Sequence, residues 1–146
     1  MKIKIVISLL FLVLSSSVLA ENSTTEKGYE VHYNALSTSF LSPEVAKSYH
    51  IGRSKTKGFV NISVMKQNEG KVSKSVEAEI NISARNYYGQ SKEVTLRKIR
   101  ENDSAIYYIG TFPVSSHETI KFKAQVKPKG TDVAIDISFD QEFFTD

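Results

Sequence analysis

Apolar and polar side chains alternate along most of this chain, a pattern typical of β-strands with one buried face. The alternation is regular over residues 120–126 and 133–139, and it recurs over residues 76–84 and 60–65. Residues 105–114 (AIYYIGTFPV) are apolar on both faces, as expected for a central strand. Period two therefore predicts a protein built mainly from short antiparallel strands.

The first run of this kind in the body of the chain is YEVHYNAL, residues 29–36. Period two places its odd-numbered residues on the buried face. His32 and Asn34 then stand two residues apart on the opposite, polar face. Polar strand faces need no function, but this row is the first place to look for a site.

Residues 42–49 (SPEVAKSY) break the alternation and predict a short helix. Ser42 is suited to the N-cap, Pro43 to the first helical position and Glu44 to the first turn. Gly52 is placed to end the helix.

Turn residues separate the apolar runs at hairpin-like spacing, for example at Gly70, Gly89 and Gly130. The sequence therefore predicts an all-β fold, an immunoglobulin-like antiparallel β-sandwich of about seven strands with one short helix after the first strand. A small β-barrel is the alternative, because the number of strands does not decide whether a sheet closes.

Residues 1–20 have the layout of a cleaved secretory signal peptide. Two early lysines precede an apolar run of about ten residues, too short to span a bilayer as a helix. Val18 and Ala20 stand at the cleavage-site positions. Residues 21–27 are polar and predict a flexible N-terminus, and residues 28–146 predict a single β-sandwich domain. With no cysteine, the chain can be neither a lipid-anchored lipoprotein nor a disulfide-stabilised domain.

The charge of the chain gives little reason to expect a nucleic-acid partner. The net charge is +3 for the full sequence, and it falls to +1 without Lys2 and Lys4 of the signal. Nucleic-acid binding needs a concentrated basic surface, and here the lysines are scattered. After cleavage of the signal we expect no stable membrane anchor.

Side chains suited to catalysis or metal binding are few. The three histidines, His32, His50 and His117, share no ligand spacing, so no metal or other cofactor is expected. A soft copper site using Met65 and one histidine would require the fold to bring them together. The chain lacks G-x-S-x-G, a phosphate-binding glycine loop and H-E-x-x-H, so a non-catalytic role is favoured over an enzyme.

A cationic segment and an aromatic pair are further candidates for a binding surface. Arg53, Lys55 and Lys57 place three cations on one side of an extended segment. They either protect a sheet edge from aggregation or form a docking strip for an acidic partner or an anionic envelope polymer. In the pair Tyr107–Tyr108 one side chain should point outward to a binding surface, and one hydroxyl is suited to tie a loop.

Five stretches resemble a known family when taken together: "VHYNALSTSFLSPEVAKSY", "RSKTKGFVNISVMK", "ARNYYGQ", "ENDSAIYYIGTFPV" and "ISFDQEFF". They resemble the small exported gammaproteobacterial proteins grouped as domain of unknown function 4426. The resemblance extends from Gly28 to Phe144. It implies a periplasmic location and agrees with an immunoglobulin-like sandwich, but it implies no activity and no catalytic residues.

These observations predict a non-catalytic periplasmic binding or protein-interaction module, whose partner is a periplasmic protein or an envelope component. The candidate binding residues are His32, Asn34, Arg53, Asn61 and Tyr108. One alternative is an enzyme acting on an envelope polymer or peptide, with His32 or Glu30 as general base and Arg53 as an anion clamp. The other is a periplasmic metal-handling protein.

Overall fold

The computed structural model describes residues 22–146, and the predicted signal peptide, residues 1–20, lies outside them. The larger sheet contains β1 (Asn22–Glu26), β2 (Tyr29–Ser37), β3 (Lys57–Asn68), β4 (Lys71–Ser75), β7 (Arg97–Glu101) and β8 (Ala105–Pro113). The smaller sheet contains β5 (Ala78–Asn86), β6 (Ser91–Lys92), β9 (Glu118–Pro128) and β10 (Ile135–Phe143). Between β2 and β3 lie a 3-10 turn, η1 (Thr38–Phe40), and the helix α1 (Pro43–Ser48).

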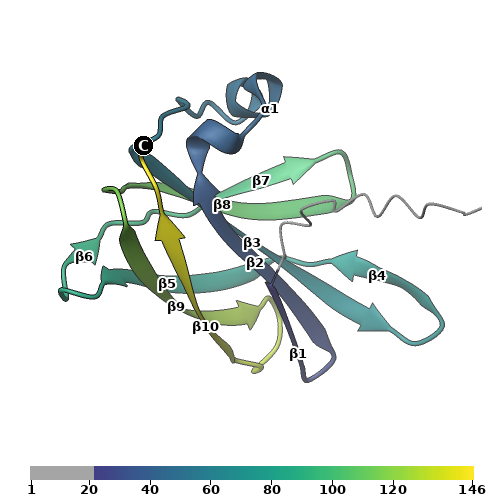
Figure 1. The fold of residues 1–146 in the computed structure, drawn as a ribbon. Helices are drawn as coiled ribbons and strands as arrows, with labels where there is room; N and C mark the ends of the chain where they lie inside the picture. Colours follow the sequence, from purple (N-terminus) through teal and green to yellow (C-terminus); the bar gives the residue numbers. More distant parts are fainter. Residues whose placement is uncertain (1–21) are drawn as a thin grey trace, which may run out of the picture.

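The two antiparallel sheets form a β-sandwich (Figure 1), and the fold class predicted from the sequence is confirmed. The strand order is β1-β2-β3-β8-β7 in the larger sheet, with β4 also paired to β3, and β10-β9-β5-β6 in the smaller sheet. Within the described residues, no helix has the length and apolar character needed to cross a membrane.

Both sheets contribute to one aromatic core. Tyr33 of the larger sheet packs against Phe139 of the smaller sheet, with ring centroids 4.8 Å apart. Phe112 and Phe122 meet edge to face at 5.4 Å. Such ring pairs add to the stabilisation that burial of the apolar area provides. A Cβ at Gly58 would overlap the ring of Phe112, so the close approach of β3 to this ring requires glycine there.

The helix begins as the sequence predicts and ends differently. Ser42 is the N-cap, and its hydroxyl accepts a hydrogen bond from the Val45 amide at 3.2 Å. The helix stops at Ser48, and the left-handed residue that follows its C-cap is His50, with φ 55°. The prediction that Gly52 ends the helix is therefore wrong. Histidine is one of the few non-glycine residues enriched in this conformation.

The η1–α1 segment covers one end of the outer face of the larger sheet (Figure 1). The buried Thr38 hydroxyl donates to the Ser54 carbonyl at 3.0 Å and accepts from the Ser54 amide at 2.9 Å. The Tyr49 hydroxyl donates to the Glu101 carboxylate on β7. Ile109 pairs with an outward residue of β3, yet only 1% of it is exposed, because the segment lies against it.

The described residues form ten strands, more than the seven or so expected. Residues 22–26, predicted as part of a flexible terminus, form β1 and pair with β2. The strands β4, β6 and β7 were not predicted either. Their sequences, KVSKS, SK and RKIRE, are short and polar, so they carry little of the apolar alternation that marks a half-buried strand. The strands β1, β4, β6 and β7 are therefore recognised from their pairing with neighbouring strands and not from their own sequences.

A closed polar network joins β5, β6 and the start of β9, and we define it as Asn86, Lys92, Ser115 and Glu118. The Glu118 carboxylate accepts hydrogen bonds from Asn86 Nδ2 at 2.9 Å, Lys92 Nζ at 2.8 Å and the Ser115 amide at 2.8 Å. Its side chain is only 9% exposed. Burial raises the pKa of Glu118, but the hydrogen bonds from Lys92 and Asn86 outweigh it, so the pKa lies below its ordinary value.

Candidate functional site

The outward side chains of β2 and β3 form a polar row on the outer face of the larger sheet. The antiparallel register produces three cross-strand pairs in this row: Glu30 with Met65, His32 with Ser63, and Asn34 with Asn61. The alternate residues Val31, Ile62 and Val64 point into the core and are fully buried. The core therefore fixes the register, and the register fixes which polar side chains become neighbours.

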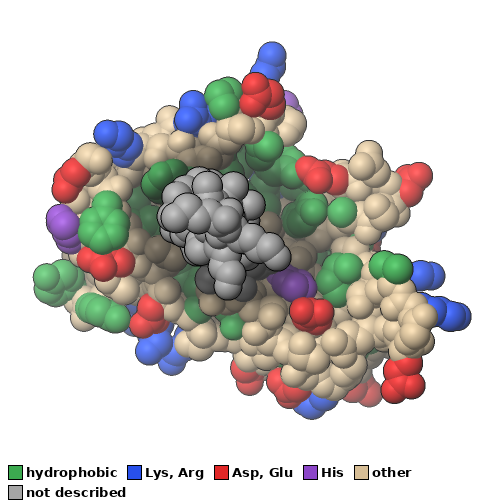
Figure 2. All heavy atoms as spheres, turned by 45° about the vertical axis from the view of Figure 1, so that its right-hand side comes forward, with side chains coloured by type: hydrophobic (Ala, Val, Ile, Leu, Met, Phe, Trp, Pro, Cys, Tyr) green, Lys and Arg blue, Asp and Glu red, His purple; other side chains and the backbone are tan. Residues whose placement is uncertain are grey.

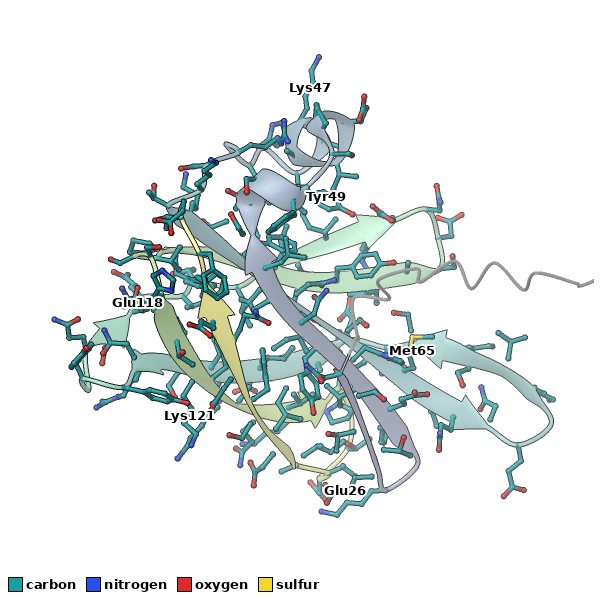
Figure 3. The ribbon with its side chains drawn as sticks, in the orientation of Figure 1. Glu26, Lys47, Tyr49, Met65, Glu118 and Lys121 are labelled. Atoms are coloured by element: carbon teal, nitrogen blue, oxygen red, sulfur yellow. The ribbon has the colours of Figure 1, made fainter. Side chains whose placement is uncertain are left out.

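Glu30, His32 and Met65 are neighbours on this face, and we call them the donor group. His32 Nε2 and Glu30 Oε1 are 3.2 Å apart, and the two side chains are 27% and 29% exposed. Met65 stands directly across the ladder from Glu30 and diagonally from His32, within reach of a long side chain. Figure 3 shows the Met65 side chain on β3, alongside β4.

A hollow of about 250 Å³ opens beside this group, lined by His32, Ser63, Met65 and Tyr107 among others. It exists because β3 changes partner along one edge. β8 pairs with β3 as far as Ile62, whereas β4 pairs with it from Met65 onward. The two partner strands leave a space at the exchange, and His32 and Met65 of the donor group line it.

Three of the five predicted binding residues lie together on the polar row: His32, Asn34 and Asn61. The Asn61 Oδ1 atom is buried and has no hydrogen-bond partner among residues 22–146. An unpaired buried acceptor costs stability.

Arg53 and Tyr108 lie elsewhere. Arg53 donates to the Ser39 carbonyl at 2.9 Å, beyond the far end of β2. That end is about 16 Å from His32 at the usual rise of a strand. Tyr108 points into the sandwich, where its hydroxyl accepts a hydrogen bond from the Ala78 amide at 2.8 Å and ties the two sheets together. Its neighbour Tyr107 is the outward member of the pair and lines the hollow.

Glu30, Met65 and Tyr107 belong to this site but are not among the five predicted binding residues; Met65 is predicted only for the alternative copper site and Glu30 only as an alternative general base. The sequence places Met65 on an outward position of its strand and Tyr107 opposite to Tyr108, but nothing local indicates which strands pair or in which register. The convergence of Met65 with His32 is a property of the folded sheet.

The donor chemistry of the site is mixed. No group of three or more His, Cys, Asp or Glu residues that could hold a metal ion occurs within residues 22–146. The donor group instead combines one imidazole, one carboxylate and one thioether. Figure 2 shows acidic, basic and hydrophobic side chains interspersed on one side of the molecule, so that side has no large area of a single charge.

The fold and this face define a class: a small two-sheet antiparallel β-sandwich with a polar, partly open sheet face. The model of the family described as domain of unknown function (DUF4426) matches residues 23–146. The chain belongs to this family, as its resemblance in sequence predicts.

Solved structures agree with this assignment. A DUF4426 family protein from Pseudomonas aeruginosa is 36% identical, with 86% of this chain and 96% of that chain covered and a TM-score of 0.71. FetP of a uropathogenic Escherichia coli strain, expressed in the periplasm, is 12% identical with a TM-score of 0.58, covering 86% of this chain and 94% of that chain. A copper-bound variant of FetP gives a TM-score of 0.57 at 12% identity over 85% of this chain and 95% of that chain. At this identity the two FetP structures show likeness of fold alone. No curated protein matches the chain in sequence.

Proposed function

We propose that this domain is a non-catalytic binding module of the bacterial periplasm, and that its ligand is a soft metal ion, copper in the reduced state. The observation that carries the proposal is that His32 and Met65 line one hollow, while Glu30 lies beside His32 and across the ladder from Met65. The partner that exchanges the ion would be a periplasmic protein or an envelope component.

The donor atoms favour copper(I) over harder ions. Thioether sulfur is a soft ligand that selects copper(I), and imidazole also binds copper well. A carboxylate and an imidazole alone would suit zinc equally, so Met65 is the residue that makes the site selective. Magnesium and calcium prefer oxygen ligands, so the donor group, with one imidazole and one thioether, should bind them weakly.

The spacing of the donors also fits an ion. Two nitrogen or oxygen ligands at the roughly 2.0–2.1 Å typical of tetrahedral zinc lie about 3.3 Å apart, and this sets the scale for an ion of similar size. The separation of His32 Nε2 and Glu30 Oε1 is 3.2 Å. The cross-strand position of Met65 brings the third donor from the neighbouring strand, where both strands are held by the core.

Two further observations support the proposal. A FetP variant of similar fold carries copper, which means that a sandwich of this shape can hold the ion. The predicted signal peptide and the expression of FetP in the periplasm both favour the periplasm as the compartment.

The test is a competition for copper(I) between the purified residues 21–146 and a chromophoric copper(I) chelator under anaerobic conditions. We expect one equivalent of copper(I) to bind, and we expect Met65→Leu and His32→Asn each to weaken binding about tenfold or more. Met65→Leu conserves volume and should leave zinc binding unchanged, because it removes only the soft donor.

The matched control is His117→Asn, since His117 is an exposed histidine in a turn at another part of the domain. This variant should bind copper(I) like the unmodified protein. Failure of the domain to retain copper(I), or equal retention by the unmodified protein and both donor variants, would contradict the proposal.

A further inference from the structure

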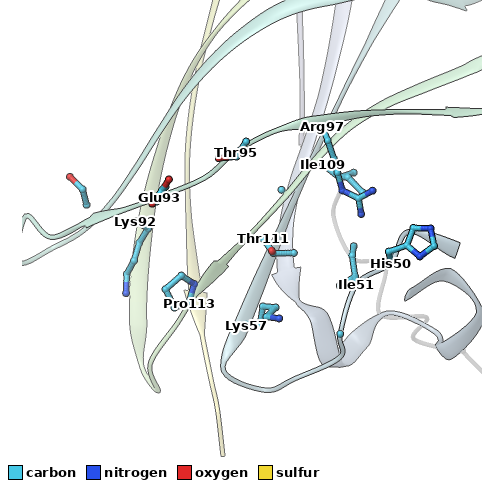
Figure 4. A pocket seen from close by; sticks show the side chains of 13 residues that line it. His50, Ile51, Lys57, Lys92, Glu93, Thr95, Arg97, Ile109, Thr111 and Pro113 are labelled. Atoms are coloured by element: carbon cyan, nitrogen blue, oxygen red, sulfur yellow. The ribbon is translucent and has the colours of Figure 1, made fainter. Parts of the chain in front are cut away.

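A second and larger hollow, of about 570 Å³, lies on the part of the larger sheet next to the η1–α1 segment. Four parts of the chain line it: the residues after α1, the first residue of β3 (Lys57), the stretch from β6 to the start of β7, and the end of β8. In Figure 4, Thr111 of β8 lies between two groups of side chains. His50 and Arg97 are on one side, Lys92 and Glu93 are on the other, and Lys57 lies below Thr111 in this view.

The hollow exists because β8 loses its neighbour before it ends. β7 pairs with β8 only from Ala105 to Ile109. Beyond that point the chain between β6 and β7 crosses from the smaller sheet to the larger one and passes close over Gly110. A Cβ on Gly110 would be 2.9 Å from Val94 Cγ1 and 3.0 Å from the Thr95 carbonyl oxygen. Glycine is therefore needed for the crossing, which leaves the edge beyond it uncovered.

The uncovered edge presents backbone groups to the hollow. The Val114 amide donates toward β3, to the Thr56 carbonyl at 3.0 Å. Successive residues of a strand direct their amide and carbonyl groups to opposite edges. Thr111 is three residues before Val114, so its backbone amide and carbonyl point to the opposite edge, away from β3. They face the hollow, next to the Thr111 and Thr95 hydroxyls.

The charges around the hollow are unevenly compensated. Lys92 is engaged by Glu118 at 2.8 Å. Lys57 and Arg97 have no carboxylate partner among residues 22–146; the Arg97 guanidinium donates to the Tyr49 carbonyl. Glu93 is the acidic residue that lines the hollow. The side of the hollow formed by Lys57, Arg97 and His50 therefore favours an anion.

We infer that this hollow is a binding site for a small hydroxylated anion, with a carboxylate or phosphate between Lys57 and Arg97 and its hydroxyl groups on Thr111 and Thr95. Charge-assisted hydrogen bonds to lysine and arginine are the strong contacts, and the threonine and backbone groups give orientation. A sugar acid or a sugar phosphate has both features. The inference is independent of the metal proposal, since the two sites share no residue.

The cationic segment predicted from the sequence supplies the controls. Of Arg53, Lys55 and Lys57, only Lys57 lines the hollow. Arg53 is engaged by the Ser39 carbonyl, and Lys55 is exposed at the turn between them. A specific site therefore requires Lys57 in particular, whereas diffuse attraction would depend on all three cations alike.

The experiment is an NMR titration of residues 21–146 with four probes: glucuronate, glucose 6-phosphate, glucose and inorganic phosphate. We expect at least one of the two sugar anions to shift the Thr95 and Thr111 amide resonances in a saturable way, and glucose to leave them in place. Comparison of glucuronate with glucose 6-phosphate distinguishes a carboxylate from a phosphate ligand, and inorganic phosphate tests whether the hydroxyls matter.

Lys57→Met and Arg97→Met should each weaken binding of that probe about tenfold, while Lys55→Met and Arg53→Gln leave it unchanged. Met65→Leu should also leave it unchanged, so failure of the metal proposal would not affect this result. Absence of saturable shifts with both sugar anions, or an equal loss in Lys55→Met and Lys57→Met, would overturn the inference. Because Arg97 also holds Tyr49, a folding defect in Arg97→Met leaves Lys57→Met as the deciding variant.

Discussion

Glu118 and Glu30 are both carboxylates on strands with much of their side chain buried, yet their surroundings differ. Glu118 accepts bonds from a lysine, an asparagine and a backbone amide inside the closed network. Glu30 lies beside His32 and opposite Met65 on the outer sheet face, where its side chain is 29% exposed. Three hydrogen-bond donors supplied by the fold leave Glu118 little capacity for a ligand, whereas Glu30 has one neighbouring histidine and a more exposed side chain.

The comparison separates stabilising polar groups from binding ones. If it is correct, substitutions in the closed network reduce stability, and substitutions in the donor group leave stability almost unchanged while they remove binding. The expected loss of stability is therefore largest in the closed network and smallest in the donor group.

The largest loss is expected for Asn86→Ala. Asn86 is 7% exposed, and its Oδ1 accepts from the Tyr88 and Gln90 amides at 3.1 and 2.9 Å. Its Nδ2 donates to Glu118 and Gln90. Truncation removes four part-buried hydrogen bonds and leaves the Tyr88 and Gln90 amides without this acceptor, so the free energy of unfolding in urea should fall by about 3 kcal/mol.

Asn81→Ala is the matched control for this variant, because Asn81 is exposed on the same strand, β5. Its free energy of unfolding should stay within about 0.5 kcal/mol of the unmodified protein. A loss in Asn86→Ala no larger than in Asn81→Ala would mean that the closed network does not stabilise the fold.

Glu118→Gln should cost less, about 1–2 kcal/mol at neutral pH, because the shape remains and only charge-assisted bonds weaken. The pKa of Glu118 is lowered in the folded state, so its contribution is complete above the unfolded value of 4.5. It is lost as the pH falls from 4.5 through the folded pKa.

Chemical unfolding at pH 7 and at several values between about 5 and 3 measures both effects. The difference in stability between the unmodified protein and Glu118→Gln should shrink as the pH falls through this range. A difference that stays constant on acidification would show that the Glu118 charge is not what stabilises the network.

Tyr49→Phe tests a case between the closed network and the donor group, because the Glu101 carboxylate is bound by the Tyr49 hydroxyl at the protein surface. Burial of Tyr49 and its hydrogen bond to Glu101 raise the pKa of the tyrosine above its ordinary value of 10. The stabilisation should be present below pH 10 and be lost as the pH rises above it. At neutral pH the loss in Tyr49→Phe should be about 0.5 kcal/mol, since exposed polar contacts contribute little.

The measurement for Tyr49→Phe is thermal unfolding at pH 7 and across the alkaline range. The unmodified protein should lose stability above pH 10 more steeply than the variant does. Identical alkaline profiles would indicate that the Tyr49 hydroxyl does not bind Glu101 in solution.

Much of this fold could be predicted from the sequence because the central strands are amphipathic. The alternation in β2, β3 and β9 reflects burial of one face, so period two identifies these strands without tertiary information. The edge strand β7, with the sequence RKIRE, buries too little to leave such a pattern. At the end of α1, the left-handed position could be assigned to glycine from propensity alone, yet His50 occupies it.

The candidate site could be predicted only in part. His32 and Asn34 are recognisable because both belong to one strand. Met65 joins them through the pairing of β2 with β3, and the pairing register depends on contacts between residues more than thirty positions apart, such as Glu30 with Met65. Arg53 follows the helix closely in sequence, which suggested that it lies near His32. It instead bonds to Ser39, beyond the end of β2, and several residues of extended chain separate that end from His32.

The smallest loss of stability is expected for Met65→Leu, and this variant tests the open side of the comparison most directly. Met65 is on the outer face and leucine has a similar volume, so the free energy of unfolding without metal should change by less than about 0.5 kcal/mol. With free copper(I) at about 100 times its dissociation constant, a ligand that binds only the folded state adds about 2.7 kcal/mol. The unmodified protein should gain this stabilisation, and Met65→Leu should lose most of it. Thermal unfolding of both proteins with and without copper(I) measures the four values. A large loss of stability in Met65→Leu without metal would place this methionine among the stabilising groups, and the distinction between the closed network and the donor group would then fail.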